Sequence, residues 1–245
     1  MALRMTQKPP HEAEGILLVN KAAGKTSFTL VAALRKRLGV RKIGHAGTLD
    51  PFATGVMVML IGRRYTRLSD SFLCEDKEYR GRLFLGKTTD TYDCEGSEIA
   101  TSSHIPSQED IERVLTNFQG EIEQIPPMYS AKKIQGKKLY ELARKGVEIE
   151  RQPVKIHVKT TLLAYDYPYV DIQVTCSKGT YIRSIAYDIG QMLGCGAHLS
   201  SLVRTRSGCY LLEDCIEAAD INDATFNLLE KIQASADNAK HGHIP

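Results

Sequence analysis

The most informative stretch of this 245-residue chain is residues 44–56, Gly-His-Ala-Gly-Thr-Leu-Asp-Pro-Phe-Ala-Thr-Gly-Val. Its first twelve residues include three glycines, one proline and two threonines, which predicts a tight, exposed loop. Asp50 precedes Pro51, where an aspartate commonly forms an Asx turn, and it is also a candidate functional carboxylate. Nearby cations are expected to favour its charged, nucleophilic form.

The sequence around Asp50 is strongly basic. Residues 21–67 contain ten Lys and Arg residues, and Asp50 is their only acidic residue. Residues 1–212 hold 30 Lys and Arg against 22 Asp and Glu, a net charge of +8, whereas residues 213–245 hold 2 against 7, a net charge of −5. Because Lys and Arg bind phosphates with release of counterions, the basic part predicts a nucleic-acid partner. The alternative is a solvated positive face.

Composition excludes several other classes of protein. Hydrophobic residues make up 42% of the chain and charged residues 25%, which is typical of a globular protein. The longest apolar run, residues 56–61, is far shorter than the roughly 20 residues of a membrane span, and no signal peptide is evident, so we expect a cytoplasmic protein. The six cysteines form no C-x-x-C pair, which predicts neither disulfides nor a zinc site. Cys195 and His198 are expected in the core.

Local patterns predict an α+β fold with a mixed or antiparallel sheet, because strands and helices alternate irregularly. Strands are expected at residues 15–20, 56–61, 78–85, 154–163 and 169–176. Helices are expected at residues 28–38, 107–118, 137–145 and 180–193, with a helical turn at 66–72 and a polar loop at 87–97. Thr26 or Ser27 begins the first helix and Gly39 ends it, while Ser107 and Asp110 cap the second.

Residues 81–88, Gly-Arg-Leu-Phe-Leu-Gly-Lys-Thr, match the phosphate-binding pattern G-x-x-x-x-G-K-[ST]. A phosphate cradle needs small residues in a flexible loop, whereas residues 82–85 are strand formers. No helical pattern follows Thr88. We therefore expect a strand that leads into a loop and no nucleotide cofactor, although an NTPase is kept as the least favoured alternative.

Two tyrosines lie beside cations in the sequence. Tyr79 occurs in Lys-Glu-Tyr-Arg at residues 77–80, and Tyr181 occurs in Lys-Gly-Thr-Tyr-Ile-Arg at residues 178–183. Proteins that bind single-stranded RNA use this pairing to stack an unpaired base and hold its phosphate. Either tyrosine alone is also consistent with a core residue.

Together, these segments resemble the tRNA pseudouridine synthase B (TruB) family. The likeness runs in order from about residue 15 to about residue 206. It is carried by residues 15–21, 44–56, 77–80, 89–91, 124–131 and 178–183. The resemblance implies a pseudouridine synthase fold in residues 1–212, with a long, mainly antiparallel mixed sheet, flanking helices and an RNA-binding cleft. It further implies isomerisation of uridine 55 to pseudouridine in the T loop of tRNA, with no metal or other cofactor.

The resemblance also implies roles for particular residues. Asp50 is the catalytic aspartate, and Arg183 is its ion-pair partner. Whether Asp50 attacks C6 of the base, attacks C1′ or removes the C2′ proton stays open. The resemblance also implies a target base that is flipped out into a pocket. Substrate-binding residues stack on this base, line its pocket, wedge the site open or support it. They are His45, Tyr79, Tyr181, Arg183, Leu202, Lys21 and Asp90.

The sequence departs from the family pattern at two places. Ala22 and Ala23 follow Lys21 where the family usually has a proline. Family members commonly continue into an RNA-binding domain of the PUA type, and the short acidic segment 213–245 predicts that this domain is absent or vestigial. We expect a monomer that contacts the T arm of tRNA. The runner-up interpretation is a non-catalytic RNA-binding protein with the same basic face and stacking tyrosines.

Overall fold

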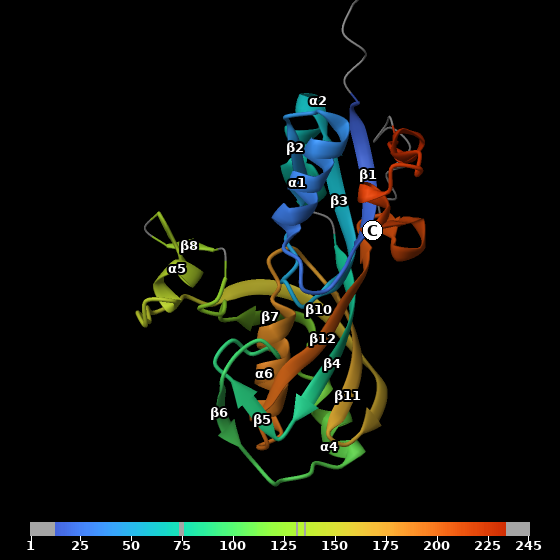
Figure 1. The fold of residues 1–245 in the computed structure, drawn as a ribbon. Helices are drawn as coiled ribbons and strands as arrows, with labels where there is room; N and C mark the ends of the chain where they lie inside the picture. The colour runs from blue at the N-terminus through green and yellow to red at the C-terminus, as the bar shows by residue number, and fades with distance from the viewer. Residues whose placement is uncertain (1–12, 74–75, 131, 135, 234–245) are drawn as a thin grey trace, which may run out of the picture.

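The computed structural model describes residues 13–73, 76–130, 132–134 and 136–233 (Figure 1). Its centre is a ten-stranded sheet. The strands of this sheet are β1 (Gly15–Lys21), β2 (Ile43–Ala46), β3 (Thr54–Ile61), β4 (Lys77–Leu85), β7 (Gln119–Gln124), β10 (Val154–Asp166), β11 (Tyr169–Cys176), β12 (Ala197–Ser207), β13 (Tyr210–Leu211) and β14 (Ile216–Glu217).

The main path of the sheet runs β14-β1-β3-β12-β4-β11-β10-β7, with β2 paired to β3 and β13 paired to β12. β14 pairs in parallel with β1, and β12 pairs in parallel with β3. The other pairs described in this sheet are antiparallel. The predicted mixed, mainly antiparallel sheet is therefore confirmed.

Short helices and two small hairpins flank the sheet. The helices are α1 (Ser27–Leu38), α2 (Gly62–Thr66), α3 (Ser69–Leu73), α4 (Gln108–Leu115), α5 (Leu139–Ala143) and α6 (Ile182–Met192). The hairpins pair β5 (Lys87–Thr89) with β6 (Glu98–Thr101) and β8 (Lys133–Ile134) with β9 (Lys137–Lys138). Short 3₁₀ turns follow at Leu212–Asp214, Asp220–Asn222 and Leu228–Lys231. Among the described residues, no helix has the length and apolar content of a membrane span.

Capping signals in the sequence located two helices correctly. The Thr26 hydroxyl accepts a hydrogen bond from the backbone N–H of Thr29 at the start of α1, and Gly39 ends this helix with a φ of 69°. At α4, Ser107 and Asp110 form the predicted capping box. These signals act within a few residues, which is why a sequence pattern was enough to find them.

The prediction of a loop over residues 44–55 was wrong at both ends. Its first residues belong to β2 and its last residues to β3, which pair with each other from Ile43↔Ile61 to Ala46↔Val58. Three other boundaries also differ. Residues 66–72 span the last residue of α2, a turn at 67–68 and most of α3. Residues 137–138 form β9 ahead of α5, and residues 87–89 of the expected loop form β5. In the β2, β5 and β9 cases the strand is stabilised by a partner strand, which local composition does not reveal.

The apparent phosphate-binding motif is a strand, as predicted. Residues 81–85 complete β4, and Gly86 turns the chain into β5 with a φ of 84°. Cys195 and His198 are both buried, and the Nδ1 atom of His198 lies 3.0 Å from the carbonyl oxygen of Lys87. Both are therefore core residues, as predicted.

The described part of the acidic segment packs onto the sheet. Ile216 of β14 pairs with Val19, and Ile221 and Leu228 are buried in the main hydrophobic cluster. Arg37 of α1 donates hydrogen bonds to three carbonyl oxygens of this segment, those of residues 223, 224 and 226. The proposed division of the chain at residue 212 stays a prediction, and residues 234–245 lie outside the described residues.

Side chains on both faces of β1 and β3 are buried, and this fixes the pairing of the two strands next to the loop that carries Asp50. Alternate side chains of these strands enter two hydrophobic clusters, one on each side of the sheet. A shift of one residue would exchange the two faces, so the register is strongly determined. The loop of residues 47–53 therefore leaves β2 and enters β3 from fixed positions.

Candidate active site

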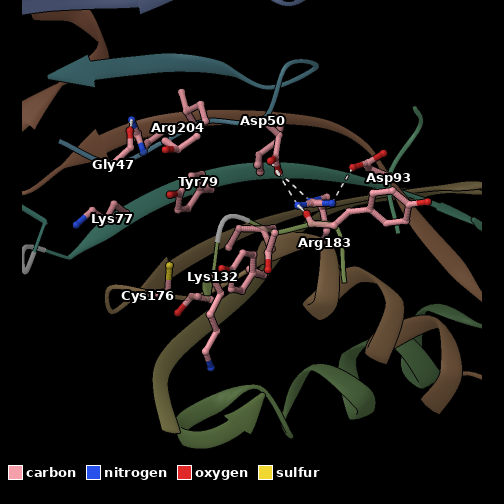
Figure 2. A pocket seen from close by; sticks show the side chains of 18 of the residues that line it. Gly47, Asp50, Lys77, Tyr79, Asp93, Lys132, Cys176, Arg183 and Arg204 are labelled. Atoms are coloured by element: carbon pink, nitrogen blue, oxygen red, sulfur yellow. Dashed lines mark hydrogen bonds and ion pairs between the residues drawn. The ribbon is translucent and has the colours of Figure 1, made fainter. Parts of the chain in front are cut away.

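A cleft of about 1000 Å³ lies where the loop 47–53 faces the start of α6 (Figure 2). Its lining includes residues of this loop, of β4 and β12, of the segments 91–95 and 129–144, of the start of β10 and of residues 176–183. Five residues that the sequence analysis singled out line it, namely Asp50, Tyr79, Tyr181, Arg183 and Leu202. The fold thus brings together residues separated by as many as 152 positions in the chain.

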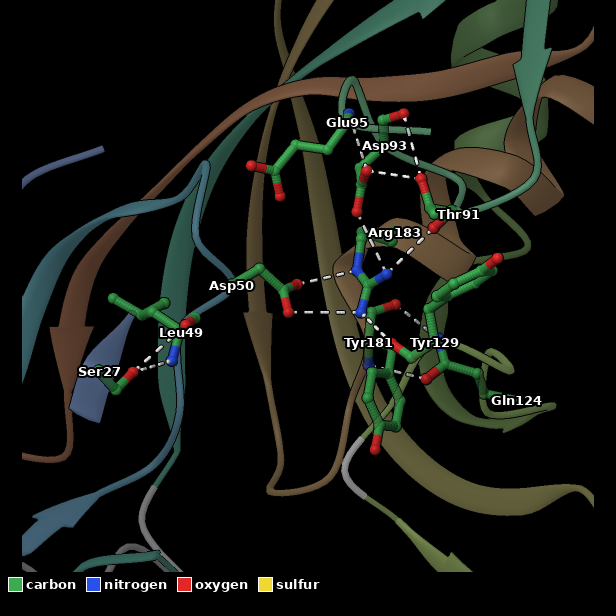
Figure 3. A network of polar contacts seen from close by, with 10 residues as sticks. All are labelled: Ser27, Leu49, Asp50, Thr91, Asp93, Glu95, Gln124, Tyr129, Tyr181 and Arg183. Carbon is green, nitrogen blue, oxygen red and sulfur yellow. Dashed lines mark hydrogen bonds and ion pairs between the residues drawn. The ribbon is translucent and has the colours of Figure 1, made fainter. Parts of the chain in front are cut away.

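Asp50 and Arg183 form an ion pair in this cleft (Figures 2 and 3). The Nε atom of Arg183 lies 2.8 Å from Oδ2 of Asp50, and Nη2 lies 3.4 Å from Oδ1. The Arg183 side chain is only 5% exposed, whereas that of Asp50 is 34% exposed. A planar guanidinium that faces both oxygens fixes the direction of a carboxylate. The carboxylate is therefore half-buried and partly open to the cleft, while its cation is buried.

Arg183 is also held from its other side. Its Nη1 atom lies 3.2 Å from Oδ2 of Asp93 and donates to the carbonyl oxygen of Thr91 at 3.0 Å (Figure 3). Its Nη2 atom donates to the carbonyl oxygen of Tyr129 at 2.8 Å. The guanidinium thus has little freedom to move away from Asp50.

The electrostatics of Asp50 differ from the sequence-based expectation. Burial raises the pKa of the Asp50 carboxyl above its ordinary value, Arg183 and Lys21 act to lower it, and Asp93 acts to raise it. The neighbouring cations do favour the charged form, as expected, but burial has the larger effect, so the net shift of the pKa is upward. Glu95 is a further acid near this cluster, and burial together with Asp93 and Asp50 raises its pKa.

Gln124 positions the start of α6. Its side-chain oxygen accepts a hydrogen bond from the backbone N–H of Tyr181 at 2.8 Å, and its side-chain nitrogen donates to the carbonyl oxygen of Tyr181 at 3.0 Å (Figure 3). Gln124 is buried at the end of β7. Since Arg183 follows two residues later, this contact also places the ion pair.

Tyr79 and Leu202 come from the adjacent strands β4 and β12 and line the cleft from the sheet. Tyr79 is 8% exposed, and burial raises the pKa of its hydroxyl, with the cation of Arg204 acting in the opposite direction. Leu202 pairs with Gly81, the residue two positions along β4 from Tyr79. An aromatic ring and an aliphatic side chain therefore form part of the apolar surface near the carboxylate.

Two polar side chains, those of Ser27 and Lys21, form hydrogen bonds with the backbone of the Asp50 loop. The hydroxyl of Ser27 donates to the carbonyl oxygen of Leu49 and accepts from its backbone N–H. The Nζ atom of Lys21 donates to the carbonyl oxygens of Ala22, Lys25 and Pro51 at 2.7–3.0 Å. Burial lowers the pKa of Lys21 to about 8, although Asp50 and Glu95 favour its charged form.

Three candidates from the sequence lie outside the cleft lining. Lys21 is buried behind the loop, as described above. His45 is half-buried on β2 rather than at the loop tip, and burial and the cation of Arg204 lower its pKa. Asp90 accepts from the backbone N–H of Ser97 at 2.8 Å, and its other oxygen lies 3.4 Å from the Tyr129 hydroxyl. The substrate-binding roles of these three residues stay predictions.

Three polar residues of the site, Asp93, Gln124 and Arg204, were assigned no role from the sequence. Each is buried, which is unusual for such polar side chains and indicates a specific partner. Asp93 lies in a turn-rich acidic stretch and Arg204 begins a run of four consecutive polar residues, so neither carries a local signal. For Gln124, the Ile-Pro-Pro sequence that follows it indicates the end of a strand, here β7. Within the described residues, no group of three or more His, Cys, Asp and Glu side chains could hold a metal ion.

Comparison with known proteins places these features in a family. A profile of the TruB family pseudouridylate synthase N-terminal domain matches residues 35–182, and one of the tRNA pseudouridylate synthase B C-terminal domain matches residues 183–237. The chain is 64% identical over 222 residues to a tRNA pseudouridine synthase B of Protochlamydia amoebophila, covering 91% of this chain and 85% of that protein. It is 57% identical over 215 residues to a tRNA pseudouridine synthase B of Chlamydia pneumoniae, covering 88% and 92%.

Solved structures agree with this assignment. The chain is similar to one in the crystal structure of a Cbf5-Nop10-Gar1 complex, with 31% identity and a TM-score of 0.67, covering 86% of this chain and 54% of that one. It is also similar to a chain in the archaeal box H/ACA sRNP Nop10-Cbf5 complex, with 27% identity and a TM-score of 0.64, covering 90% and 59%. This chain spans little more than half the length of those two. With a family profile over more than half of its residues and relatives of this identity, the chain belongs to the TruB family of pseudouridine synthases.

Proposed function

We propose that this enzyme converts uridine 55 in the T loop of tRNA to pseudouridine, with Asp50 as the nucleophile and the target base flipped out of its stack. A member of the TruB family forms pseudouridine in tRNA. The proposal adds the position, the attacking group and the extruded base. The observation that carries it is the partly exposed Asp50 carboxylate held by a buried Arg183 inside the cleft.

The proposed isomerisation needs a nucleophile, and the Asp50 carboxylate that is paired with Arg183 can supply it. Pseudouridine formation breaks the bond between C1′ and N1 and forms a bond between C1′ and C5. The C5 proton leaves and N1 takes up a proton, so the isomerisation is balanced without an oxidant or a reductant. Asp50 supplies the nucleophile, and Arg183 keeps it oriented and favours its charged form.

The depth of the site supports base flipping. Tyr79 and Leu202 are nearly buried, so a base that stays stacked in an RNA helix cannot contact them. Enzymes that act on a base extrude it into a pocket and stack it against aromatic and apolar side chains. In this cleft the Tyr79 ring is the stacking surface, Leu202 packs beside it, and Tyr181 lines the same pocket.

Electrostatics support an RNA substrate. The helices α1 and α2 lie in the same lobe of Figure 1, and these helices and the turns that follow them carry exposed cations. They are Arg35, Lys36, Arg41, Lys42, Arg63, Arg64 and Arg67. Within the described part of the chain, none of these seven is ion-paired with a carboxylate. Their charge is therefore available to phosphates.

Release of tritium tests the proposal directly. A tRNA transcript labelled with tritium at C5 of its uridines loses one label to water for each pseudouridine formed. We expect about one equivalent per tRNA from the wild-type transcript and none from a transcript with cytidine at position 55. Undiminished release from the substituted transcript would show that another uridine is the target.

A further inference from the structure

Arg204 is a buried cation whose role the reaction scheme above does not include. Its residue is 1% exposed, and within the described residues no carboxylate forms an ion pair with it. A buried charge without an ionic partner is costly, so its hydrogen bonds must compensate for much of the loss of water. The positions of its acceptors therefore indicate what the side chain does.

The acceptors lie at the two ends of the loop that carries Asp50. The Nε atom of Arg204 donates to the carbonyl oxygen of Val56 at 2.7 Å, in β3 near the exit of the loop. Its Nη2 atom donates at 3.2 Å to the carbonyl oxygen of Gly47, the first residue of the loop, and lies 3.1 Å from the sulfur of Met57. Figure 2 shows the Arg204 side chain beside Gly47. One guanidinium thus connects the entry and the exit of the loop.

The backbone around this guanidinium is adapted to it. Gly47 has a φ of 90°, and a Cβ atom there would lie 3.3 Å from Nη1 of Arg204. At Gly55, with a φ of 107°, a Cβ atom would lie 2.2 Å from the carbonyl oxygen of Arg204. Both glycines therefore allow β12 and its arginine to approach the loop more closely than another residue would permit.

Arg204 also lies next to Tyr79. The two residues are register partners on β12 and β4, and the guanidinium interacts with the Tyr79 hydroxyl. The other charged or titratable groups that influence this hydroxyl are Cys176 of β11 and Asp50 of the loop. One side chain therefore contacts both the aromatic surface and the loop that presents the carboxylate.

We propose that Arg204 is a positioning residue that fixes the distance and orientation of Asp50 relative to Tyr79 by joining both ends of the Asp50 loop. This inference rests on the proposed role of Asp50 as the nucleophile. Arg204 lines the cleft, but its residue is only 1% exposed and its Nε and Nη2 atoms donate to backbone carbonyl oxygens, so it acts through the Asp50 loop and not through contact with a phosphate.

The proposal predicts an effect on kcat and not on KM. Removal of the guanidinium in Arg204→Met lets the loop shift, and a misplacement of about 1 Å lowers catalysis by about 100-fold. KM for tRNA is expected to stay within about 3-fold of wild type. Arg204→Lys keeps the charge but cannot reach both carbonyl oxygens in the same way, so its kcat is expected to lie between those of Arg204→Met and wild type.

The matched control is Arg206→Met, on the same strand. Its half-buried guanidinium donates to the carbonyl oxygen of Gly208, outside the loop, so its kcat is expected to stay within about 2-fold of wild type. Hydrogen exchange supplies a second measurement. In Arg204→Met the amides of Leu49 and Ala53, which bond within this region, should exchange faster, while those of β4 and β11 should not.

Wild-type kcat in either Arg204 variant would overturn the proposal, as would an increase in KM with kcat unchanged. If Arg204→Met does not fold, the kcat and KM of Arg204→Lys decide in the same way. Asp50→Asn, assayed in parallel, separates this inference from the proposed function. Activity in Asp50→Asn would contradict the proposal that Asp50 is the nucleophile. If Asp50→Asn is inactive but both Arg204 variants are fully active, only the proposed role of Arg204 is wrong.

Discussion

Asp93 lies 3.2 Å from the Nη1 atom of Arg183, and both side chains are only 5% exposed. Asp50 occupies the other side of the same guanidinium, so two carboxylates share one buried cation. Asp93 is itself fixed, since its Oδ1 atom accepts hydrogen bonds from the Thr91 hydroxyl and from the backbone N–H of Glu95. The more buried acid therefore anchors Arg183, which leaves the more exposed Asp50 oriented toward the cleft.

This arrangement predicts that Asp93→Asn lowers both stability and turnover. Loss of one partner from a buried ion pair costs about 3 kcal/mol, which urea unfolding would measure. We also expect kcat to fall by about 100-fold because Arg183 is then free to shift. Asp171→Asn is the matched control, since it breaks the exposed ion pair with Arg82 and should cost less than about 1 kcal/mol. Equal losses in the two variants would contradict the anchoring role.

The acid limb of the pH–rate profile gives a second prediction. Burial raises the pKa of Asp50 above the ordinary aspartate value of 3.8, and the proposed reaction needs the ionised form. Activity should therefore be lost, as the pH falls, at a pH above that value. An acid limb centred at or below 3.8 would contradict this prediction.

Asp50→Asn should abolish turnover and leave tRNA binding nearly intact. Arg183 keeps Asp93 and two carbonyl oxygens as partners, so the site should remain folded. Affinity comes from many cations, and we expect the Kd to change by less than about 10-fold, or about 1.4 kcal/mol. Filter binding and tritium release measure the two quantities. Turnover near the wild-type rate would rule out Asp50 as the nucleophile.

Substitutions at Tyr79 separate stacking from hydrogen bonding. Tyr79→Phe keeps the ring face and should retain substrate binding, whereas Tyr79→Ala should lose about 1–3 kcal/mol of base stacking. Since Tyr79 is nearly buried, the alanine variant also leaves a cavity, so its folded state must be checked by thermal unfolding. Equal losses of binding in both variants would mean that the hydroxyl matters more than the ring.

The sequence predicted those features that depend on neighbouring residues. The capping residues of α1 and α4 and the alternating pattern of β4 all act locally, and each located its element. β12 was missed because two bulges, at Leu199/Ser201 and at Arg204/Arg206, interrupt its alternation. β7 was missed because it is a polar edge strand whose only apolar side chain is Ile122.

The same distinction applies to the site. The motifs that carry the family resemblance contain Asp50, Tyr79, Tyr181 and Arg183, and the structure brings all four to one cleft. Asp93 and Arg204 act through contacts with residues 90 and 157 positions away, which no local pattern encodes. The net direction of the Asp50 pKa was also out of reach, because the sequence shows nearby cations but not the burial that outweighs them.

The last prediction concerns which parts of tRNA the enzyme contacts. Residues 213–233 contain six carboxylates and one lysine, and this segment packs along β1 and α1. An acidic surface repels phosphates, so the segment should lie away from the RNA. We therefore expect an isolated T stem-loop to be modified with a kcat/KM close to that of full tRNA. Tritium release from the two substrates measures this ratio, and a preference for full tRNA above about 100-fold, or roughly 2.7 kcal/mol, would show that contacts outside the T arm stabilise the transition state.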